Sequence, residues 1–244
     1  MTNTPLLEVC VADAESLAAA IAGGADRIEL CSALELGGLT PAPGLMRLAA
    51  QAPIPVYAMV RPRSGDFVFS SDELDVMRAD IDAISGAGLA GAVIGASRRD
   101  GTLDEDMLQH LRDHAQGLGL TLHRAFDLVP DFAPAIETAI GLGIERILTS
   151  GGARSVPEGI PALRSIHAMA RGRISVMPGG GLTAENAGEL LKAVPVMEVH
   201  SSCSLPRATP DQRAVELHLA ERSHRRTSAD MVAAFKGALS NPSS

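Results

Sequence analysis

The sequence predicts an α/β protein, a (β/α)8 or TIM barrel that folds as a single domain over residues 1–244. Short apolar runs alternate with amphipathic stretches along the chain, which is the pattern of repeated βα units around a parallel sheet. A length of 244 residues fits one such barrel. In an open dinucleotide-binding sheet, a Gly-x-Gly-x-x-Gly motif follows the first strand. No such motif follows the first apolar run here. A closed barrel is therefore expected.

Eight strands are expected where turn residues delimit short apolar runs. Their ranges are 6–11, 26–31, 54–60, 91–95, 120–124, 145–149, 173–177 and 196–200. Helices are expected over 13–22, 43–51, 71–86, 104–117, 131–141, 158–170 and 184–192, and a last helix over 228–239. Capping boxes are expected at Ser70 and at Thr102, because Glu follows each of them three positions later.

Residues 205–227 break this alternation of strands and helices. They are polar, they show no clear period, and they include five arginines: Arg207, Arg213, Arg222, Arg225 and Arg226. The sequence predicts an irregular segment before the last helix, which is either a solvated loop or a contact between subunits.

The composition argues against several classes of partner. A net charge of -8 and a pI near 5.3 argue against nucleic acid and anionic membranes. Aromatic residues make up only 2% of the chain, so stacking on bases is not expected. Three cysteines form no disulfide framework of a small secreted protein, and no apolar run approaches the roughly 18 residues that span a bilayer. We expect a soluble protein of a reducing, cytoplasmic compartment.

An acid and a thiol, two residues apart, recur in the first two expected strands. They are Glu8 and Cys10 in the first strand, and Glu29 and Cys31 in the second. Because side chains alternate along a strand, each acid points the same way as its thiol. Two carboxylates and two thiols then face one interior space. Isolated buried carboxylates are costly, so this pattern indicates a site.

Further inward residues follow from the apolar face of each strand, which must meet the helices. The inward set is Glu8, Cys10, Glu29, Cys31, Met59, Arg61, His123, Glu198 and His200. The test leaves the strands at 91–95 and 145–149 ambiguous. A single inward histidine is more often a satisfied core group. Six ionisable groups near the carboxyl ends of five strands favour a ligand or catalytic site, because barrel active sites lie there.

The charges of this set do not balance. Three carboxylates face one guanidinium, so a protonated glutamate, charged histidines, or a bound cation or ligand is expected. A glutamate of raised pKa beside a histidine also serves general acid–base catalysis. The catalytic candidates are Glu8, Glu29, Arg61, His123, Asp127, Glu198 and His200.

A glycine-rich loop follows the seventh strand and leads into a helix capped by Thr183. Its backbone amides can meet an anion at the start of that helix, unless the glycines only form a tight turn. Loops after the seventh and eighth strands are the usual phosphate site of barrels, and the loop after the sixth adds donors. The anion-binding candidates are Ser150, Gly151, Gly179, Gly180, Gly181 and Ser201.

Seven segments together resemble the CutC copper-homeostasis family. They are residues 7–11, 24–32, 37–41, 61–67, 123–127, 146–151 and 177–181, in order along residues 6 to about 204. The resemblance implies a TIM barrel, a cytoplasmic setting, a homodimer and a role in handling Cu(I). It also implies Cys10 and Cys31 as the copper ligands.

Two hypotheses for the function follow. Thiolate and thioether ligands select Cu(I), and Met59 could join the two cysteines in a copper site. Copper leaves the acids, the arginine and the histidines unexplained. The alternative is an enzyme acting on a small phosphorylated or carboxylated sugar-like compound. In that enzyme Glu8, Glu29 or Glu198 would transfer protons with His123, and Arg61 would clamp the anion.

Overall fold

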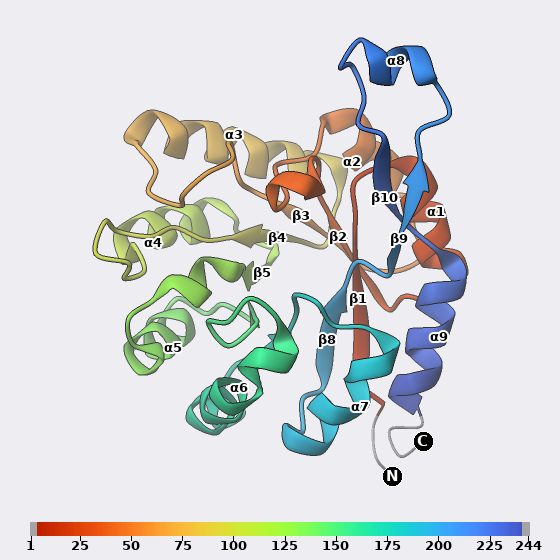
Figure 1. Ribbon diagram of the computed structural model, residues 1–244. Helices are drawn as coiled ribbons and strands as arrows, with labels where there is room; N and C mark the ends of the chain where they lie inside the picture. The colour runs from red at the N-terminus through yellow and green to blue at the C-terminus, as the bar shows by residue number, and fades with distance from the viewer. Residues whose placement is uncertain (1–3, 241–244) are drawn as a thin grey trace.

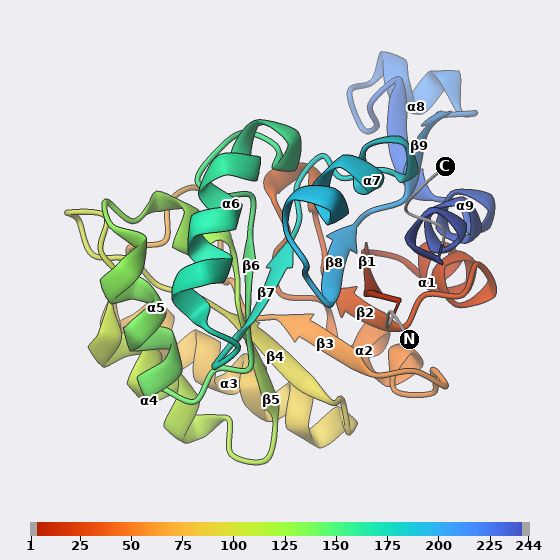
Figure 2. The same ribbon diagram turned by 90° about the horizontal axis from the view of Figure 1, so that it is seen from below.

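Eight parallel strands form a barrel in the computed structural model, which describes residues 4–240 (Figures 1 and 2). The strands are β1 (Leu6–Val11), β2 (Arg27–Leu30), β3 (Val56–Met59), β4 (Gly91–Ile94), β5 (Gly119–Leu122), β6 (Arg146–Thr149), β7 (Ser175–Pro178) and β8 (Glu198–Ser201). Each strand from β1 to β6 pairs with the next, and β8 pairs with β1. A bridge between Gly179 and His200 joins β7 to β8. The predicted (β/α)8 barrel is confirmed.

Helices surround the strands, as Figure 1 shows. They are α1 (Ala14–Ala22), α2 (Pro43–Ala49), α3 (Ser71–Ala87), α4 (Glu105–His114), α5 (Phe132–Gly141), α6 (Val156–Ala170), α7 (Ala184–Ala193) and α9 (Ala229–Ser240). Two 3-10 helices, η1 (Leu34–Leu36) and η2 (Arg124–Leu128), follow β2 and β5.

The two expected capping boxes differ in outcome. Ser70 caps α3 and forms the predicted box with Glu73. The box expected at Thr102 is wrong, because Asp104 caps α4 instead and accepts a hydrogen bond from the N–H of Met107. The hydroxyl of Thr102 donates to Asp100 in the turn before the helix. That turn therefore uses the hydroxyl that the predicted box needed as its cap.

The apolar core is divided between the outside and the inside of the barrel. The outer core joins the outward strand residues to the helices, with fully buried side chains such as Leu7, Ile28 and Ile147. Inside the barrel, a separate apolar cluster contains only Cys31, Tyr57, Met59 and Val93, with Leu34 packed against it. The rest of the interior is therefore available for polar side chains.

Two glycines make room for Tyr57 across the bottom of the barrel. A Cβ atom added at Gly91 would lie 2.2 Å from the Tyr57 ring, and one at Gly119 would lie 2.3 Å from its hydroxyl oxygen. The Tyr57 hydroxyl donates to Glu145 at 2.9 Å, and the charged head of Arg146 lies 4.7 Å from the ring centre. The tyrosine and its partners fill the end of the barrel where the strands begin.

The segment predicted to be irregular contains regular structure. It forms an antiparallel hairpin of β9 (Ser204–Ala208) and β10 (Ser223–Thr227), with the short helix α8 (Gln212–Glu216) at its tip. Figure 1 shows the hairpin projecting beyond the ring of helices. Arg207 and Arg226 both pair with Glu15 of α1. Backbone pairing and these ion pairs hold the hairpin, so its strands carry no apolar stripe that the sequence could reveal.

Among residues 4–240, no helix is long and apolar enough to cross a membrane.

Candidate functional site

A pocket of about 500 Å³ opens where the strands end. Its lining includes many of the predicted site residues: Cys10, Glu29, Arg61, His123, Gly179, Gly180, Gly181, His200 and Ser201. Met59, Phe67 and Arg124 also line it. The structure thus brings together side chains from β1, β2 and β8 and from the loops that follow β3, β5 and β7.

The other predicted site residues lie outside the pocket lining, where protein groups already contact them. Glu8 and Glu198 lie lower in the barrel, and Cys31 is fully buried beside Glu29. Ser150 and Gly151 use their donors within the loop after β6, because the Ser150 hydroxyl donates to Ala153 and the Gly151 N–H to Thr149.

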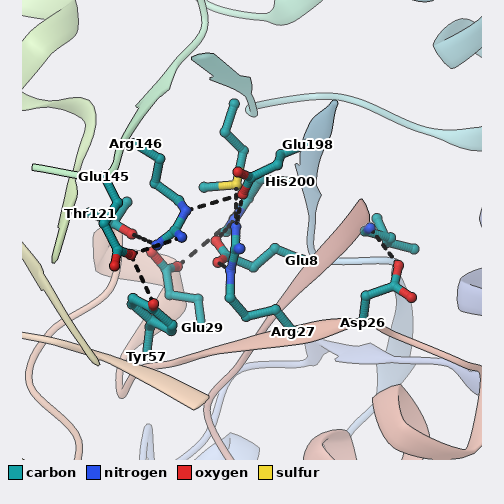
Figure 3. A network of polar contacts seen from close by, with 12 residues as sticks. Glu8, Asp26, Arg27, Glu29, Tyr57, Thr121, Glu145, Arg146, Glu198 and His200 are labelled. Atoms are coloured by element: carbon teal, nitrogen blue, oxygen red, sulfur yellow. Dashed lines mark hydrogen bonds and ion pairs between the residues drawn. The ribbon is translucent and has the colours of Figure 1, made fainter. Parts of the chain in front are cut away.

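A layer of ion pairs lies below the pocket, and Figure 3 shows how it converges on Glu198. Arg27 donates to both Glu8 and Glu198. Arg146 also donates to Glu198, at 3.1 Å, and Ser175 donates to it at 2.8 Å. Two carboxylates and two guanidinium groups therefore neutralise each other within the barrel.

This layer corrects the charge balance inferred from the sequence. The expected surplus of negative charge is wrong. The sequence identified Glu8 and Glu198 as inward residues, but it did not identify Arg27 and Arg146, which also face the interior and pair with them. Arg27 shares its parity with Glu29 in β2, which is a signal that the sequence offered. In β6 both Ile147 and Leu148 are apolar, so alternation could not show which way Arg146 points.

The pKa of Glu8 shows how strongly the layer holds this carboxylate. Burial raises the pKa of Glu8, but the hydrogen bond to His200 and the charge of Arg27 outweigh it and lower the pKa to about 2. Burial also raises the pKa of Glu198, and Arg27 and Arg146 lower it below its usual value. Both carboxylates are therefore ionised at neutral pH and form part of the framework.

His200 connects this layer to the pocket. Its Nδ1 lies 2.8 Å from a carboxylate oxygen of Glu8, and its Nε2 lies 3.8 Å from Glu29. Burial lowers the pKa of His200, but Cys10 and Glu29 outweigh it and raise the pKa well above its usual value. Burial raises the pKa of Glu29. The ring of His200 is therefore held by Glu8 with its other nitrogen toward the pocket.

One group in the described part of the chain could hold a metal ion. Ligand atoms of Cys10, Glu29 and His200 lie within 4.8 Å of one another. The thiol and the imidazole suit copper, whereas the carboxylate suits harder cations. Cys31, expected as the second thiol ligand, is not in this group: its thiol donates to Glu29 at 3.5 Å, and burial raises its pKa. The group that meets this distance limit therefore contains one sulfur atom, that of Cys10.

His123 presents a single N–H to the pocket. Its Nδ1 accepts the backbone N–H of Ala125 at 3.1 Å. Burial and then the charge of Arg61 lower the pKa of His123 to about 3, so the ring is neutral and its proton lies on Nε2. Gly95 gives the ring its place, because a Cβ atom there would lie 2.2 Å from the imidazole. A neutral imidazole fixed in this way acts as a hydrogen-bond donor.

Arg61 is held by the loops after β2 and β3. Its terminal nitrogens donate to the carbonyls of Leu36, Gly38 and Gly65, at 2.9, 3.2 and 2.8 Å. Its guanidinium lies over the Phe67 ring, and the other neighbour of that ring is His123, with a centroid separation of 4.8 Å. Arg61 and His123 therefore both contact the Phe67 ring.

Three buried polar atoms in this pocket have no hydrogen-bond partner. They are Oε1 of Glu29, Nε of Arg61 and Nε2 of His123. Each residue is at most 5% exposed, and all three line the pocket. Leaving a buried donor or acceptor unpaired costs about 1–3 kcal/mol. Their convergence in one cavity is typical of a site that a ligand completes.

A second cationic group lies at the other side of the pocket. Arg124 donates to Asp127 at 2.7 Å and to Ser150 at 2.6 Å, while its Nη1 donates to no described residue. Asp127 also accepts the N–H groups of Ser150 and Gly152, which fixes the loop after β6. A Cβ atom at Gly180 would lie 3.1 Å from Arg124 Nη1. Asp127 thus holds Arg124 against the glycine-rich loop, a role that its side chain plays from outside the pocket.

The fold and this site define a (β/α)8-barrel protein with a pocket at the carboxyl ends of its strands. Its sequence matches the CutC family model over residues 5–205. A family protein CutC from Sinorhizobium medicae is 59% identical over 237 residues, 97% of each chain. One from Agrobacterium fabrum is 50% identical over 242 residues, 98% of this chain and 96% of that one. The chain belongs to the CutC family.

Solved structures agree with this assignment. A proposed copper homeostasis protein CutC from Streptococcus agalactiae superposes with a TM-score of 0.78 at 32% identity, over 81% of this chain and 98% of that chain. A thiamine phosphate pyrophosphorylase from Pyrococcus furiosus superposes over 100% of this chain and 99% of that one, with a TM-score of 0.61 at 15% identity. The second likeness shows the fold alone.

Proposed function

We propose that this protein is an enzyme that binds a small, oxygen-rich anion and acts on it by acid–base chemistry. One observation carries this proposal: the three unpartnered polar atoms of Glu29, Arg61 and His123 in one buried pocket. Two of them are N–H donors, which suit an anionic oxygen of the ligand. The third belongs to a carboxyl group, which can exchange a proton with the ligand.

A second end of the ligand would lie against the glycine-rich loop. Arg124 presents a free Nη1 there, and Gly180 and Gly181 precede the first turn of α7. Backbone N–H groups and the positive end of a helix favour phosphate or carboxylate. A pocket of about 500 Å³ has room for a compact metabolite with an anionic group at each end.

Thermal unfolding with three probe ligands tests this function. Phosphoglycolate carries a phosphate and a carboxylate, whereas inorganic phosphate and acetate carry one of them each. We expect phosphoglycolate to raise Tm more than either small anion, because a ligand of the native state stabilises it by mass action. Arg124→Met should abolish most of this shift, and Arg164→Met, an exposed arginine of α6, should preserve it. Equal shifts in the two variants, or none in the wild type, would contradict the proposal.

Copper handling is the second candidate function. It is supported by the family and by the cluster of Cys10, Glu29 and His200. In this function, copper is a cargo that Cys10 and His200 would bind. The protein would then act in the cytoplasm as a homodimer. Competition with a Cu(I) chelator tests it: Cys10→Ser should weaken binding at least tenfold, and Cys31→Ser should weaken it further if both thiols are ligands. Unchanged affinity in the double variant rules this function out.

A further inference from the structure

The two unpartnered N–H groups of the pocket come from two residues that contact one aromatic ring, that of Phe67. The Arg61 guanidinium lies 4.8 Å from the centre of the Phe67 ring, and the His123 ring centre lies 4.8 Å from it. Every other nitrogen of these two side chains already has a protein partner. Nε of Arg61 and Nε2 of His123 have no partner among the described residues, and both atoms are buried. This pair is a preorganised cradle for a negatively charged oxygen.

The unpartnered carboxyl oxygen belongs to a residue that lines the same pocket, Glu29. Oε2 of Glu29 accepts the Cys31 thiol at 3.5 Å, which leaves Oε1 without a partner. A carboxyl oxygen that is buried and unpaired in this way is available to a proton of the ligand. Glu29 lies on β2, and the two residues of the cradle lie on the loops after β3 and β5. All three line one pocket.

We propose that the pocket catalyses proton transfer at a carbon next to a carbonyl, with Glu29 as the base and with Arg61 and His123 as donors to the resulting enolate oxygen. This inference rests on the proposed function and names its reaction. The substrate class is a phosphorylated α-hydroxy ketone or aldehyde, whose phosphate would lie at Arg124 and the glycine-rich loop.

The step is balanced within the site. Glu29 removes a proton from the hydroxyl-bearing carbon, and the electron pair of that C–H bond forms a C=C bond. The carbonyl pair moves onto oxygen, where the N–H groups of Arg61 and His123 stabilise the negative charge. Glu29 then returns the proton to the neighbouring carbon, and the proton of the original hydroxyl moves to the former carbonyl oxygen, which gives the isomeric carbonyl compound. No oxidant, reductant or further reactant is needed.

The cradle also explains why His123 is held neutral. An N–H donor that matches the enolate in proton affinity stabilises it without transferring a proton to it outright. The ring has no acidic partner among the described residues: Nδ1 receives a backbone N–H, and the charge that acts on its pKa is that of Arg61. A histidine that served as a proton shuttle would instead need a partner for its cationic form.

Deuterium exchange tests the reaction. The full-length protein is incubated in D2O with dihydroxyacetone phosphate or erythrulose phosphate, and carbon-bound deuterium is measured by NMR. We expect exchange well above the protein-free rate, and at least about 100-fold slower exchange in Glu29→Gln. His123→Phe should lose about 100-fold or more, while His123→Gln, which keeps an N–H donor, should recover part of the rate. Thermal unfolding checks that each variant is folded.

A binding measurement distinguishes this inference from the proposed anion-binding function on which it rests. Phosphoglycolohydroxamate mimics the planar enediolate, and phosphoglycolate is its carboxylate counterpart. Tighter binding of the hydroxamate, by at least about tenfold, supports enolate stabilisation. Binding of phosphoglycolate with no exchange in either ketose overturns the reaction and leaves the anion-binding function standing. Absence of both binding and exchange overturns both.

Discussion

Glu8 offers a quantitative test of the ion-pair layer below the pocket. The carboxyl group is fully buried, and its contacts with His200 and Arg27 lower its pKa from 4.5 to about 2. A shift of about 2.5 units at 1.36 kcal/mol each corresponds to about 3 kcal/mol of stability. A carboxyl group whose pKa is lower in the folded state stabilises the fold above its unfolded pKa. That contribution is lost as the pH falls through the folded pKa.

The perturbation is Glu8→Gln, and the assay is urea unfolding of wild type and variant between pH 2 and pH 7. At neutral pH the variant should be less stable, because it removes a buried ionic partner of Arg27. The difference in unfolding free energy should then shrink by about 3 kcal/mol between pH 5 and pH 2. Glu105→Gln, on the exposed surface of α4, serves as the control. A difference for Glu8→Gln that does not change with pH would refute the reasoning.

Three further predictions concern the framework around the pocket. Arg27→Met should cost about 3–5 kcal/mol of unfolding free energy in a urea titration, because it leaves buried carboxylates without their shared partner; a cost below 1 kcal/mol would contradict this. Gly95→Ala should displace the imidazole of His123 and abolish the Tm shift from phosphoglycolate, whereas Gly86→Ala, with open space around it in α3, should leave that shift intact. NMR titration should find His123 neutral and His200 protonated throughout pH 5–7, and a midpoint for either ring within that range would count against the assigned contacts.

Much of the barrel could be predicted from the sequence because its strands are short and apolar on the side that meets the helices. The inward direction of Glu8, Glu29, Arg61 and His200 followed from that alternation alone. The alternation of apolar and polar residues gives no direction where both faces of a strand are apolar, as in β6. The inward position of Arg146 was missed for this reason. The same alternation also fails for the β9–β10 hairpin, whose strands are held by backbone pairing and by ion pairs with α1.

The sequence predicted which residues gather at the candidate site, but not which role each of them has there. Sequence position cannot show that Glu198 is neutralised by two arginines or that Asp127 is used in fixing Arg124. Nor can it show which atoms stay unpaired. The free Nε of Arg61 depends on three loop carbonyls that occupy its other nitrogens, and those contacts come from parts of the chain that meet only in the fold.

Two proposed functions have to be distinguished: copper binding at the thiols, and acid–base chemistry on an anion at the unpartnered polar atoms. A crystal structure with bound phosphoglycolate separates them most directly. The account predicts that carboxylate oxygens of the ligand lie within about 3.2 Å of Nε of Arg61 and Nε2 of His123. Its phosphate should lie at Arg124 and Gly180. A ligand bound elsewhere, with both of these nitrogens still unpaired, would contradict the central claim.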